Sequence, residues 1–453
     1  MKTMKRNEVI EVKIEDHSFP NTGIGHVEGK KVQVKGAFPG EVVAARAHQV
    51  RGDRAKGRFI EVLEKAPYAV DAPCIHFGRC GGCISQQVPL PLQRTFKEQE
   101  VQKLFLQNDL SMGEYLGVVG EKEQYEYRNK MEYTFGDAVK DGELNLGMHL
   151  KSMKNSVLNT EECILVSEDF RKIHAFTIDY FRKLDLPYYR VMRQEGYLRN
   201  LLIRRGVQTG ELMVNLVTTT QREVDLTPYK EGLLALALTD DLVSILHTEN
   251  DNLADAVHVD KLNILYGRDY ITERLFDLTF KISPFSFFQT NTKGAEVLYE
   301  EVRKLIGEEK NEIFDLYCGT GTIGQIVAHK AKKVTGVEIV EEAVVAANEN
   351  VRTNGLDHVH FLAGDVKDVI ETLEGQPELI ILDPPRSGVH PKALSYVHAF
   401  GAKELIYVSC NPKTLVIDLK VLVSEGYEVI KTKIVDLFPN TPHVETVCLL
   451  TRK

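Results

Sequence analysis

Over residues 7–65, apolar and polar positions alternate in short runs, such as Lys31-Val-Gln-Val-Lys and Arg58-Phe-Ile-Glu-Val-Leu. Turn-forming stretches separate the runs, among them Asn21-Thr-Gly23-Ile-Gly25 and Phe38-Pro39-Gly40. A period of two predicts strands that are buried on one face, and several short strands joined by turns are typical of a small barrel. We therefore expect an N-terminal β-barrel of the oligonucleotide-binding type at residues 1–66.

The middle of the chain combines one helix-like stretch with several strand-like stretches. Residues 91–110 place Phe96, Val101, Leu104 and Phe105 on one side of a helix. From 125 to 280, strand-like segments alternate with turns, which indicates a mixed α+β domain at residues 67–280. The helix at 91–110 is a candidate to pack on the C-terminal domain.

Strands and helices alternate from residue 281 to the end of the chain. Apolar runs at 312–316, 333–339, 358–362, 378–382 and 404–409 are separated by helical stretches. This alternation requires a mostly parallel sheet with helices on both faces, so residues 281–453 are predicted to form an α/β, Rossmann-like domain. Residues 427–451 carry two further strand-like runs without a helix between them, which we expect to close the sheet as an antiparallel pair.

The composition is that of an ordinary globular protein, with 43% hydrophobic and 27% charged residues in a chain of 453. Such a length suggests roughly three domains. No apolar run is long enough to cross a membrane, and the first eight residues lack the apolar core of a signal peptide. We expect a cytoplasmic protein without a membrane partner, and we expect it to be a monomer.

The charge of the chain is unevenly distributed. The net charge of −9 argues at first sight against a nucleic-acid partner, yet residues 1–65 hold 13 Lys and Arg against 9 Asp and Glu. A basic module on an acidic protein can hold RNA, because phosphate contacts depend on local charge. An ordinary solvated surface explains the same count equally well.

Three of the predicted C-terminal strands end in residues that can carry chemistry. They end at Asp315-Leu-Tyr-Cys-Gly319-Thr-Gly321, at Asp383-Pro-Pro and at Ser409-Cys410-Asn-Pro. The carboxyl ends of parallel strands meet at one edge of a sheet, where open α/β proteins bind their ligands. Cys410 is therefore a candidate nucleophile, although a free cysteine taken alone is usually a small buried hydrophobe.

The glycine loop at Gly319 and Gly321 is a candidate cofactor site. Glu338 ends the next predicted strand, 17 residues after Gly321. Glycines let a nucleoside approach the backbone, and an acidic side chain at the second strand end can accept both ribose hydroxyls. No third glycine and no Lys-Ser/Thr follow, so binding of NAD or of ATP phosphates is disfavoured. A plain structural turn is the alternative.

The cysteines indicate a metal site. Cys74, Cys80 and Cys83 lie within ten residues of one another, and Cys163 is a plausible fourth ligand. The odd total of seven and this clustering favour metal-ligating or catalytic thiols over a disulfide framework. A four-cysteine site suits either zinc or a [4Fe–4S] cluster, and the spacing alone does not choose between them.

These features together resemble one known family. The glycines of the predicted barrel, in Gly23-Ile-Gly25 and Pro39-Gly40-Glu41, resemble those of a TRAM domain, and the C-terminal glycine loop resembles class I S-adenosylmethionine-dependent methyltransferases. With the four cysteines, nearly the whole chain resembles the RNA (uracil-5-)-methyltransferase family. Within it, the likeness is closest to the iron–sulfur-containing branch that acts on 23S ribosomal RNA. The remaining motifs that carry the likeness are Phe287-Phe-Gln289-x-Asn291, Asp383-Pro-Pro-Arg, Ser409-Cys-Asn-Pro and His443-Val-Glu445-Thr.

The resemblance implies cofactors, a partner and residue roles. S-adenosylmethionine and a [4Fe–4S] cluster would be the cofactors, with zinc as the less favoured metal, and 23S ribosomal RNA would be the partner. Cys410 would attack C6 of a uracil, and Glu445 would remove the C5 proton after methylation to give 5-methyluridine. The implied cofactor-binding residues are Gln289, Tyr317, Gly319, Gly321, Glu338, Asp365 and Asp383, and the implied cluster ligands are Cys74, Cys80, Cys83 and Cys163.

Three alternatives stay open at this point. The first is a tRNA 5-methyluridine methyltransferase, a branch that by the resemblance lacks both the barrel and the cluster. The second is an amino-group RNA methyltransferase, which commonly carries Asn-Pro-Pro-aromatic where this chain has Asp383-Pro-Pro-Arg. The third is a non-catalytic RNA-binding protein with a decayed methyltransferase domain. The joint presence of Cys410, Glu445, Glu338 and the glycine loop argues against it.

Overall fold

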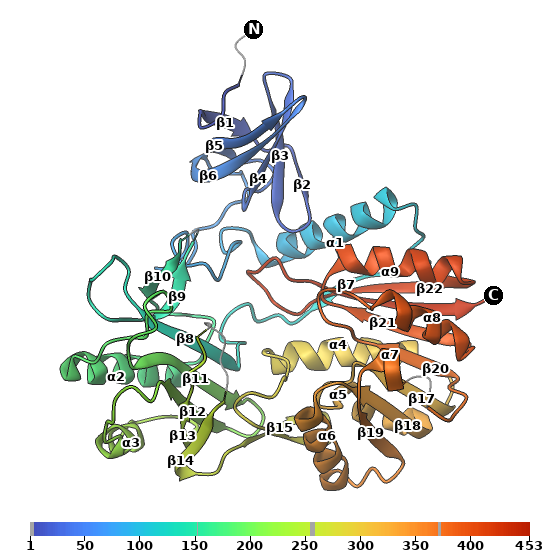
Figure 1. The fold of residues 1–453 in the computed structure, drawn as a ribbon. Helices are drawn as coiled ribbons and strands as arrows, with labels where there is room; N and C mark the ends of the chain where they lie inside the picture. The colour runs from blue at the N-terminus through green and yellow to red at the C-terminus, as the bar shows by residue number, and fades with distance from the viewer. Residues whose placement is uncertain (1–3, 152, 254–258, 370–372) are drawn as a thin grey trace.

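The computed structural model describes residues 4–151, 153–253, 259–369 and 373–453. The described strands form three large sheets and one two-stranded hairpin. In Figure 1 the N-terminal sheet lies at the top, the central sheet at the left and the C-terminal sheet at the right. None of the described helices is long and apolar enough to cross a membrane.

The N-terminal sheet has the strand order β1-β5-β6-β4-β3-β2. Its strands are β1 (Val9–Lys13), β2 (Asp16–Ser18), β3 (Thr22–Val27), β4 (Lys30–Lys35), β5 (Val42–Arg51) and β6 (Arg54–Glu64). Alternate positions face inward, so that Val12, Val32 and Val43 are fully buried. Gly25 lets β3 pass close to the end of β1, since a Cβ at this position would lie 2.1 Å from the carbonyl oxygen of Lys13. The strands predicted from the alternation over 7–65 are confirmed.

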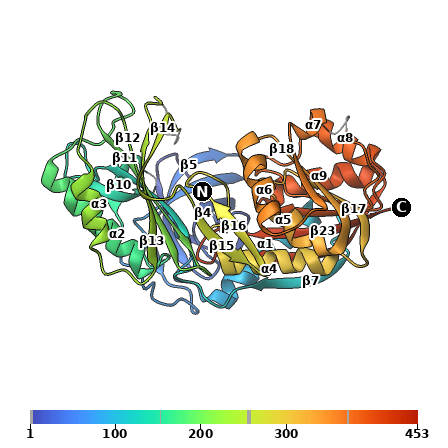
Figure 2. The same ribbon diagram turned by 90° about the horizontal axis from the view of Figure 1, so that it is seen from below.

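The central sheet is mixed and carries its helices on one face (Figure 2). Its order is β10-β9-β8-β11-β12-β13-β14, and the β12–β13 pair is parallel. The strands are β8 (Lys130–Gly136), β9 (Asn145–Leu150), β10 (Met153–Asn159), β11 (Leu198–Gly206), β12 (Glu211–Thr218), β13 (Asp241–Glu249) and β14 (Lys261–Gly267). Helices α2 (Glu168–Leu184) and α3 (Thr227–Leu234) bury Phe170 and Tyr229 against it.

The C-terminal sheet has the order β19-β18-β17-β20-β21-β23-β22-β7. Its strands are β17 (Lys310–Leu316), β18 (Ala331–Glu338), β19 (Val359–Ala363), β20 (Leu379–Leu382), β21 (Glu404–Ser409), β22 (Tyr427–Asp436), β23 (Glu445–Arg452) and β7 (Glu114–Gly120). Strands β17 to β21 pair in parallel, and β23 pairs antiparallel with both β21 and β22. The predicted parallel sheet and its antiparallel closing pair are therefore confirmed.

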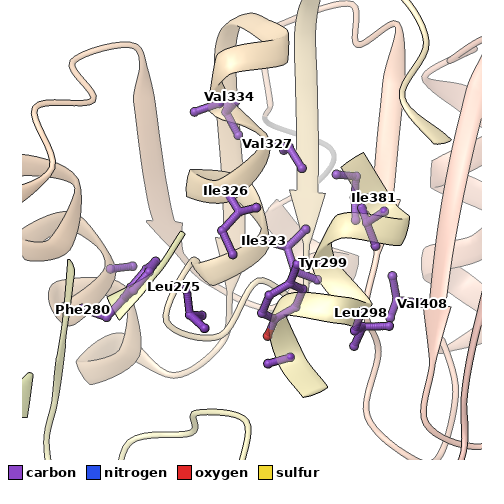
Figure 3. Close-up of a cluster of buried hydrophobic side chains, with 14 of the residues drawn as sticks. Leu275, Phe280, Leu298, Tyr299, Ile323, Ile326, Val327, Val334, Ile381 and Val408 are labelled. Carbon is purple, nitrogen blue, oxygen red and sulfur yellow. The ribbon is translucent and has the colours of Figure 1, made fainter. Parts of the chain in front are cut away.

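Helices cover both faces of this sheet. They are α4 (Thr292–Leu305), α5 (Thr322–Val327), α6 (Glu341–Thr353), α7 (Val366–Val369), α8 (Pro391–Ala399) and α9 (Pro412–Ser424). Figure 3 shows part of the core on one face, where Tyr299 of α4 and Ile323 of α5 meet Ile381 of β20. The hairpin of β15 (Ile271–Leu275) and β16 (Leu278–Ile282) adds Leu275 and Phe280 to the same core.

One segment from the range predicted to be the central domain belongs to the C-terminal sheet. Helix α1 (Leu90–Gln107) packs on α9 and on β7, and β7 pairs in parallel with β22 at the edge of the sheet. The domain limits at 66 and 280 stay predictions. The N-terminal sheet rests on α1, because His17 Nε2 lies 3.0 Å from the Phe96 carbonyl oxygen and the Asn21 amide donates to Glu100 at 2.9 Å.

Candidate active site

A cavity of about 1280 Å³ opens at the carboxyl ends of the parallel strands. Its walls also include the loop 283–290 and the start of β23. Most of the residues predicted from the sequence as catalytic or cofactor-binding line it: Gln289, Tyr317, Gly319, Glu338, Asp365, Asp383, Cys410 and Glu445. Gly321 does not line the cavity, since it caps α5 at its N-terminus just behind the loop.

The glycine loop after β17 is held by the carboxylate of Glu338. The Gly319 amide donates to Glu338 Oε2 and the Val340 amide donates to Glu338 Oε1, both at 3.0 Å. Gly321 has a φ of 70°, and a Cβ there would lie 2.4 Å from the Phe361 ring. Only glycine fits this position without rearrangement, so the loop is shaped by local sterics.

Cys410 follows β21 at the point where α9 begins. The Asn411 side chain caps α9 by accepting from the Lys413 amide, and Asn411 Nδ2 donates to the Arg386 carbonyl at 2.8 Å. These bonds fix the turn that presents the partly exposed thiol. Burial raises the pKa of Cys410 to about 11, the nearby Glu445 and Asp383 carboxylates add to the increase, and Arg386 opposes it.

The two carboxyl groups beside Cys410, those of Glu445 and Asp383, also have raised pKa values. Burial, followed by the charge of Asp383, raises the pKa of Glu445 to about 8, while Arg386 and Lys97 lower it. Burial raises the pKa of Asp383 to about 7. Perturbed carboxyl groups next to a thiol in one cavity are the arrangement expected of acid–base and nucleophilic chemistry.

Sequence comparisons extend over the whole chain. The sequence model described as tRNA (Uracil-5-)-methyltransferase matches residues 237–453, and the TRAM domain model matches residues 4–60. A protein of Clostridium tetani described as an uncharacterized RNA methyltransferase is 54% identical over 99% of both chains. One of Chlorobaculum tepidum with the same description is 34% identical over 99% of this chain and 97% of its own. The chain belongs to the RNA (uracil-5-)-methyltransferase family.

A solved structure of the same family corrects one expectation. The tRNA (uracil-54, C5)-methyltransferase of Pyrococcus abyssi, in complex with S-adenosyl-L-homocysteine, has a TM-score of 0.77 and 26% identity to this chain. The match covers 98% of this chain and 100% of the Pyrococcus chain, so it includes the N-terminal sheet. The expectation that tRNA-modifying members lack the barrel is therefore wrong, and the barrel does not distinguish rRNA from tRNA as substrate.

Other residues lining the cavity were not singled out from the sequence. Tyr299 of α4 is 4% exposed, and burial with the charges of Asp383 and Glu445 raises its pKa well above the usual value. The Gln289 side chain hydrogen-bonds to it. Arg386 lies at the cavity mouth with Nη2 3.4 Å from His443 Nδ1. The sequence could have indicated Arg386 as a site residue, because it belongs to the Asp-Pro-Pro-Arg motif. Tyr299, in contrast, lies in the pattern of an amphipathic helix, which predicts a core residue.

The loop that carries Gln289 is held by the central sheet. Arg204 of β11 is buried and donates to the carbonyl oxygens of Pro284 and Ser286. Asn129 Nδ2 donates to the Gln289 backbone carbonyl at 3.0 Å, while the Gln289 side chain hydrogen-bonds to Tyr299. The central domain therefore positions one wall of the methyltransferase cavity.

A second, smaller cavity of about 60 Å³ lies beside the first, and Cys74, Cys80, Cys83 and Cys163 all line it. Burial raises the pKa of Cys83 to about 12 and that of Cys163 to about 11. Within the described ranges, no three His, Cys, Asp or Glu side chains stand close enough together to hold an ion. Cysteine thiols are the donors that tetrathiolate zinc and iron–sulfur sites use, so the residue types, though not their present spacing, suit such a site.

Proposed function

We propose that this protein transfers a methyl group from S-adenosylmethionine to C5 of a uridine in RNA, through a covalent bond between Cys410 Sγ and C6 of the base. The observation that carries the proposal is the shared cavity in which Cys410, Glu445 and Asp383 meet at the strand ends. Membership of the RNA (uracil-5-)-methyltransferase family supports it.

Cys410 makes C5 of the base reactive. Uracil C5 is a poor nucleophile, so a thiolate first bonds to C6, and the C5–C6 double-bond electrons move toward the C4 carbonyl to give an enolate. C5 of this enolate then bonds to the methyl carbon as the bond from that carbon to sulfur breaks. S-adenosylmethionine, when bound, supplies that electrophilic methyl group on its sulfonium.

Glu445 completes the reaction. C5 still carries its hydrogen after methylation, and Glu445 removes it as a proton. The electron pair left at C5 re-forms the C5–C6 double bond, the C6–S bond breaks, and the Cys410 thiolate is released with 5-methyluridine. The raised pKa of Glu445, about 8, makes it a better base than an ordinary carboxylate once it is ionised.

The residues around the glycine loop suit the cosubstrate. Glu338 would hold the ribose hydroxyls, Asp365 would lie near the adenine, and Asp383 would border the methyl group, as the family resemblance implies. Tyr317, Gly319 and Gln289 line the same cavity, and Gly321 caps the N-terminus of α5 behind the loop. Burial also raises the pKa of Asp315 to about 8, and this side chain accepts from the Gly324 amide at 2.8 Å behind the loop.

The RNA would reach the cavity as an extruded base, because C5 and C6 are covered within stacked RNA. Phe287 lies at the cavity mouth and is 67% exposed, which gives a stacking surface for a neighbouring base. A set of cations on one face of β4, β5 and β6, here called the basic face, would contact phosphates: Lys31, Arg46, Arg51, Arg54, Lys56 and Arg58.

The basic face has a specific strand register. Arg46 is paired with Arg58 across β5 and β6, and Lys31 with Arg54 across β4 and β6. Like charges directly opposite one another destabilise a sheet. Their presence on neighbouring strands favours an anionic ligand over a randomly charged surface.

The four cysteines would hold a [4Fe–4S] cluster, with zinc as the less favoured occupant. The burial that raises the pKa of Cys83 and Cys163 leaves these thiols protonated in the absence of a metal. A metal ion or cluster replaces those protons, and thiolate ligation then offsets the cost of burial. Metal analysis and the absorption spectrum of anaerobically purified protein distinguish about four irons per chain from one zinc.

The proposed substrate is 23S ribosomal RNA, which places the proposed reaction in the cytoplasm. We expect the protein to act as a monomer. Transfer RNA is a second candidate, because the Pyrococcus enzyme with the same fold over 98% of this chain is a tRNA methyltransferase. Mass spectrometry can decide between the two substrates by measuring 5-methyluridine in ribosomal RNA and in transfer RNA from cells with and without the gene. Loss of the modification from tRNA alone contradicts the ribosomal assignment, and loss from neither contradicts the proposed reaction.

A further inference from the structure

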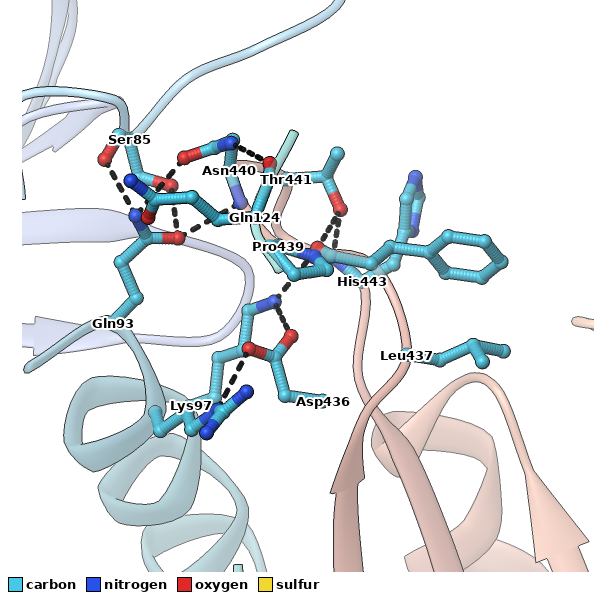
Figure 4. A network of polar contacts seen from close by, with 12 residues as sticks. Ser85, Gln93, Lys97, Gln124, Asp436, Leu437, Pro439, Asn440, Thr441 and His443 are labelled. Atoms are coloured by element: carbon cyan, nitrogen blue, oxygen red, sulfur yellow. Dashed lines mark hydrogen bonds and ion pairs between the residues drawn. The ribbon is translucent and has the colours of Figure 1, made fainter. Parts of the chain in front are cut away.

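The segment 437–444, which joins β22 to Glu445 at the start of β23, lies between the two cavities. Thr441 lines the four-cysteine cavity, whereas Phe438 and His443 line the methyltransferase cavity. Figure 4 shows the polar contacts that hold this segment. A single stretch of backbone therefore contributes to the walls of both cavities.

Asn440 ties the segment to the cysteine-bearing loop. The Ile84 amide, directly after Cys83, donates to the Asn440 carbonyl at 2.9 Å. Gln93 accepts from the Asn440 amide at 2.8 Å and donates to both Asn440 Oδ1, at 3.1 Å, and the Ser85 carbonyl, at 3.1 Å. Ser85, Gln93 and Asn440 are each at least 97% buried, so the bonds among them are made away from water.

The remaining contacts fix the segment on its other side. Asn440 Nδ2 donates to the Gln124 carbonyl at 2.8 Å, and the Tyr127 hydroxyl donates to the Pro439 carbonyl at 2.9 Å. Asn291 donates to the Leu437 carbonyl at 2.8 Å. The His443 amide lies 3.3 Å from Thr441 Oγ1, which continues the chain of bonds toward Glu445.

We propose that Asn440 is a positioning residue that couples the four-cysteine site to Glu445. A metal or cluster bound by the four thiols fixes the turn after Cys83, Asn440 transmits that order to the segment 437–444, and the segment holds Glu445 where it removes the C5 proton. The inference rests on the proposed function and on occupancy of the cysteine site. Coupling of this kind needs a contiguous network between the sites, and the bonds through Asn440 supply one.

The first test separates the elimination step from the others. Asn440→Gly removes the two side-chain bonds, to Gln93 and to the Gln124 carbonyl, and leaves the backbone bonds to Ile84 and Gln93 in place, because glycine accepts the φ of 64° that Asn440 adopts. Displacement of Glu445 is expected to slow elimination about 10²-fold, so the methylated covalent adduct with RNA accumulates on denaturing gels. Affinity for S-adenosylmethionine, measured by calorimetry, should stay within about twofold, since its site is on other strands.

A matched control is Asn350→Ala. Asn350 is also buried and bonded through its side chain, to the Lys281 amide, but it lies on α6 and has no contact in this network. It should lower stability without enriching the adduct. A wild-type share of adduct in Asn440→Gly, or an equal enrichment in Asn350→Ala, overturns the proposal. A wild-type enzyme that makes no 5-methyluridine overturns the proposed function instead.

The second test needs no catalysis. Hydrogen exchange by mass spectrometry is compared for protein as purified anaerobically, after chelation, and after reconstitution with ferrous iron and sulfide or with zinc. Exchange over residues 436–446 should speed up on chelation and recover on reconstitution, while residues 310–338 stay unchanged. A change confined to residues 74–87 overturns the coupling, and so does a protein that takes up neither iron nor zinc.

Discussion

The charges of Glu445 and Asp383 disfavour ionisation of Cys410, and the charge of Asp383 also disfavours ionisation of Glu445. Burial is the main cause of all three raised pKa values, and the carboxylate charges raise that of Cys410 further. The proposed reaction uses Cys410 and Glu445 in their ionised forms. Arg386 is the group on the cavity wall whose charge lowers both of their pKa values. Its position in the Asp-Pro-Pro-Arg motif therefore has a direct electrostatic consequence.

The rate at which free 5-methyluridine product forms should rise with pH, because it needs the thiolate of Cys410 for attack and the carboxylate of Glu445 for elimination. A pKa raised above its usual value means that the ionised form is lost at low pH and gained as pH passes through about 8 for Glu445 and toward 11 for Cys410. Single-turnover rates of product release from the adduct should therefore increase from about pH 6.5 to about pH 9. Arg386→Met should move this rise to higher pH, and Arg352→Met, on the exposed end of α6, should not. A rate that falls over this range contradicts the assignment.

Nucleophile and base can be separated by trapping. Glu445→Gln keeps the size of the side chain but cannot accept the C5 proton, so turnover should fall about 10²- to 10⁴-fold and the methylated RNA adduct should accumulate. Cys410→Ala should give no adduct and no product with S-adenosylmethionine affinity retained. Denaturing electrophoresis with labelled methyl groups measures both. An adduct in the double variant Cys410→Ala, Glu445→Gln identifies a different nucleophile.

The reactive residues at the strand ends could be predicted from the sequence. The cavity wall that contains Tyr299 could not. The alternation of strands and helices places Asp383 and Cys410 at one edge of a parallel sheet, whatever the details of packing. Tyr299 lies at a position of α4 whose apolar neighbours face the core, so its hydroxyl carries no local signal. Its contact with Gln289 depends on how two elements pack, which spacing along the chain does not encode.

At the level of elements, the attachment of α1 and β7 to the C-terminal sheet is the main feature that periodicity did not determine. The apolar positions of α1 made it a candidate to pack on the C-terminal domain, but they indicated neither the strand β7 nor the polar side chains that α1 also buries. The structure places Lys97 of α1, 2% exposed, at 2.5 Å from the buried carboxylate of Asp436 at the end of β22. Lys97 also donates to the Phe438 carbonyl at 3.0 Å.

Breaking this ion pair should be costly. Lys97→Ala leaves the buried Asp436 with Arg94, at 3.4 Å, as its one ion-pair partner among the described residues, and should lower the free energy of unfolding by about 3–5 kcal/mol. Urea unfolding followed by circular dichroism measures it. Lys103→Met is the control, because its ion pair with Asp16 is partly exposed and should contribute less than about 1 kcal/mol. Equal losses in the two variants refute a special role for the buried pair.

For the whole molecule, the N-terminal sheet combines a fixed attachment with an exposed basic face. Its β2–β3 turn rests on α1, and Phe19 lies under Lys413 of α9, three residues after Cys410. The excess of cations over residues 1–65 indicated an RNA contact but gave neither the face nor its orientation. The strand register determines which residues share the basic face. The packing of the N-terminal sheet on α1 determines its orientation, and this packing brings together residues far apart in the sequence.

The basic face should contribute affinity for RNA without sequence preference. Replacing Arg54, Lys56 and Arg58 by Gln removes three adjacent cations of β6 and should lower the slope of log Kobs against log salt by about 2–3. The rate at saturating RNA should stay unchanged, because none of these residues lines the methyltransferase cavity. Filter binding over a range of salt concentrations measures the slope, and single-turnover kinetics measure the rate.

The matched control removes three exposed cations from the central domain, with Lys183, Arg193 and Arg222 changed to Gln. Net charge falls equally in the two triple variants, so a general electrostatic effect weakens RNA binding equally in both. A contact between phosphates and the basic face lowers the salt slope only in the β6 variant. Equal slopes in the two variants would place the RNA on another surface, and they would leave the N-terminal sheet with a packing role alone.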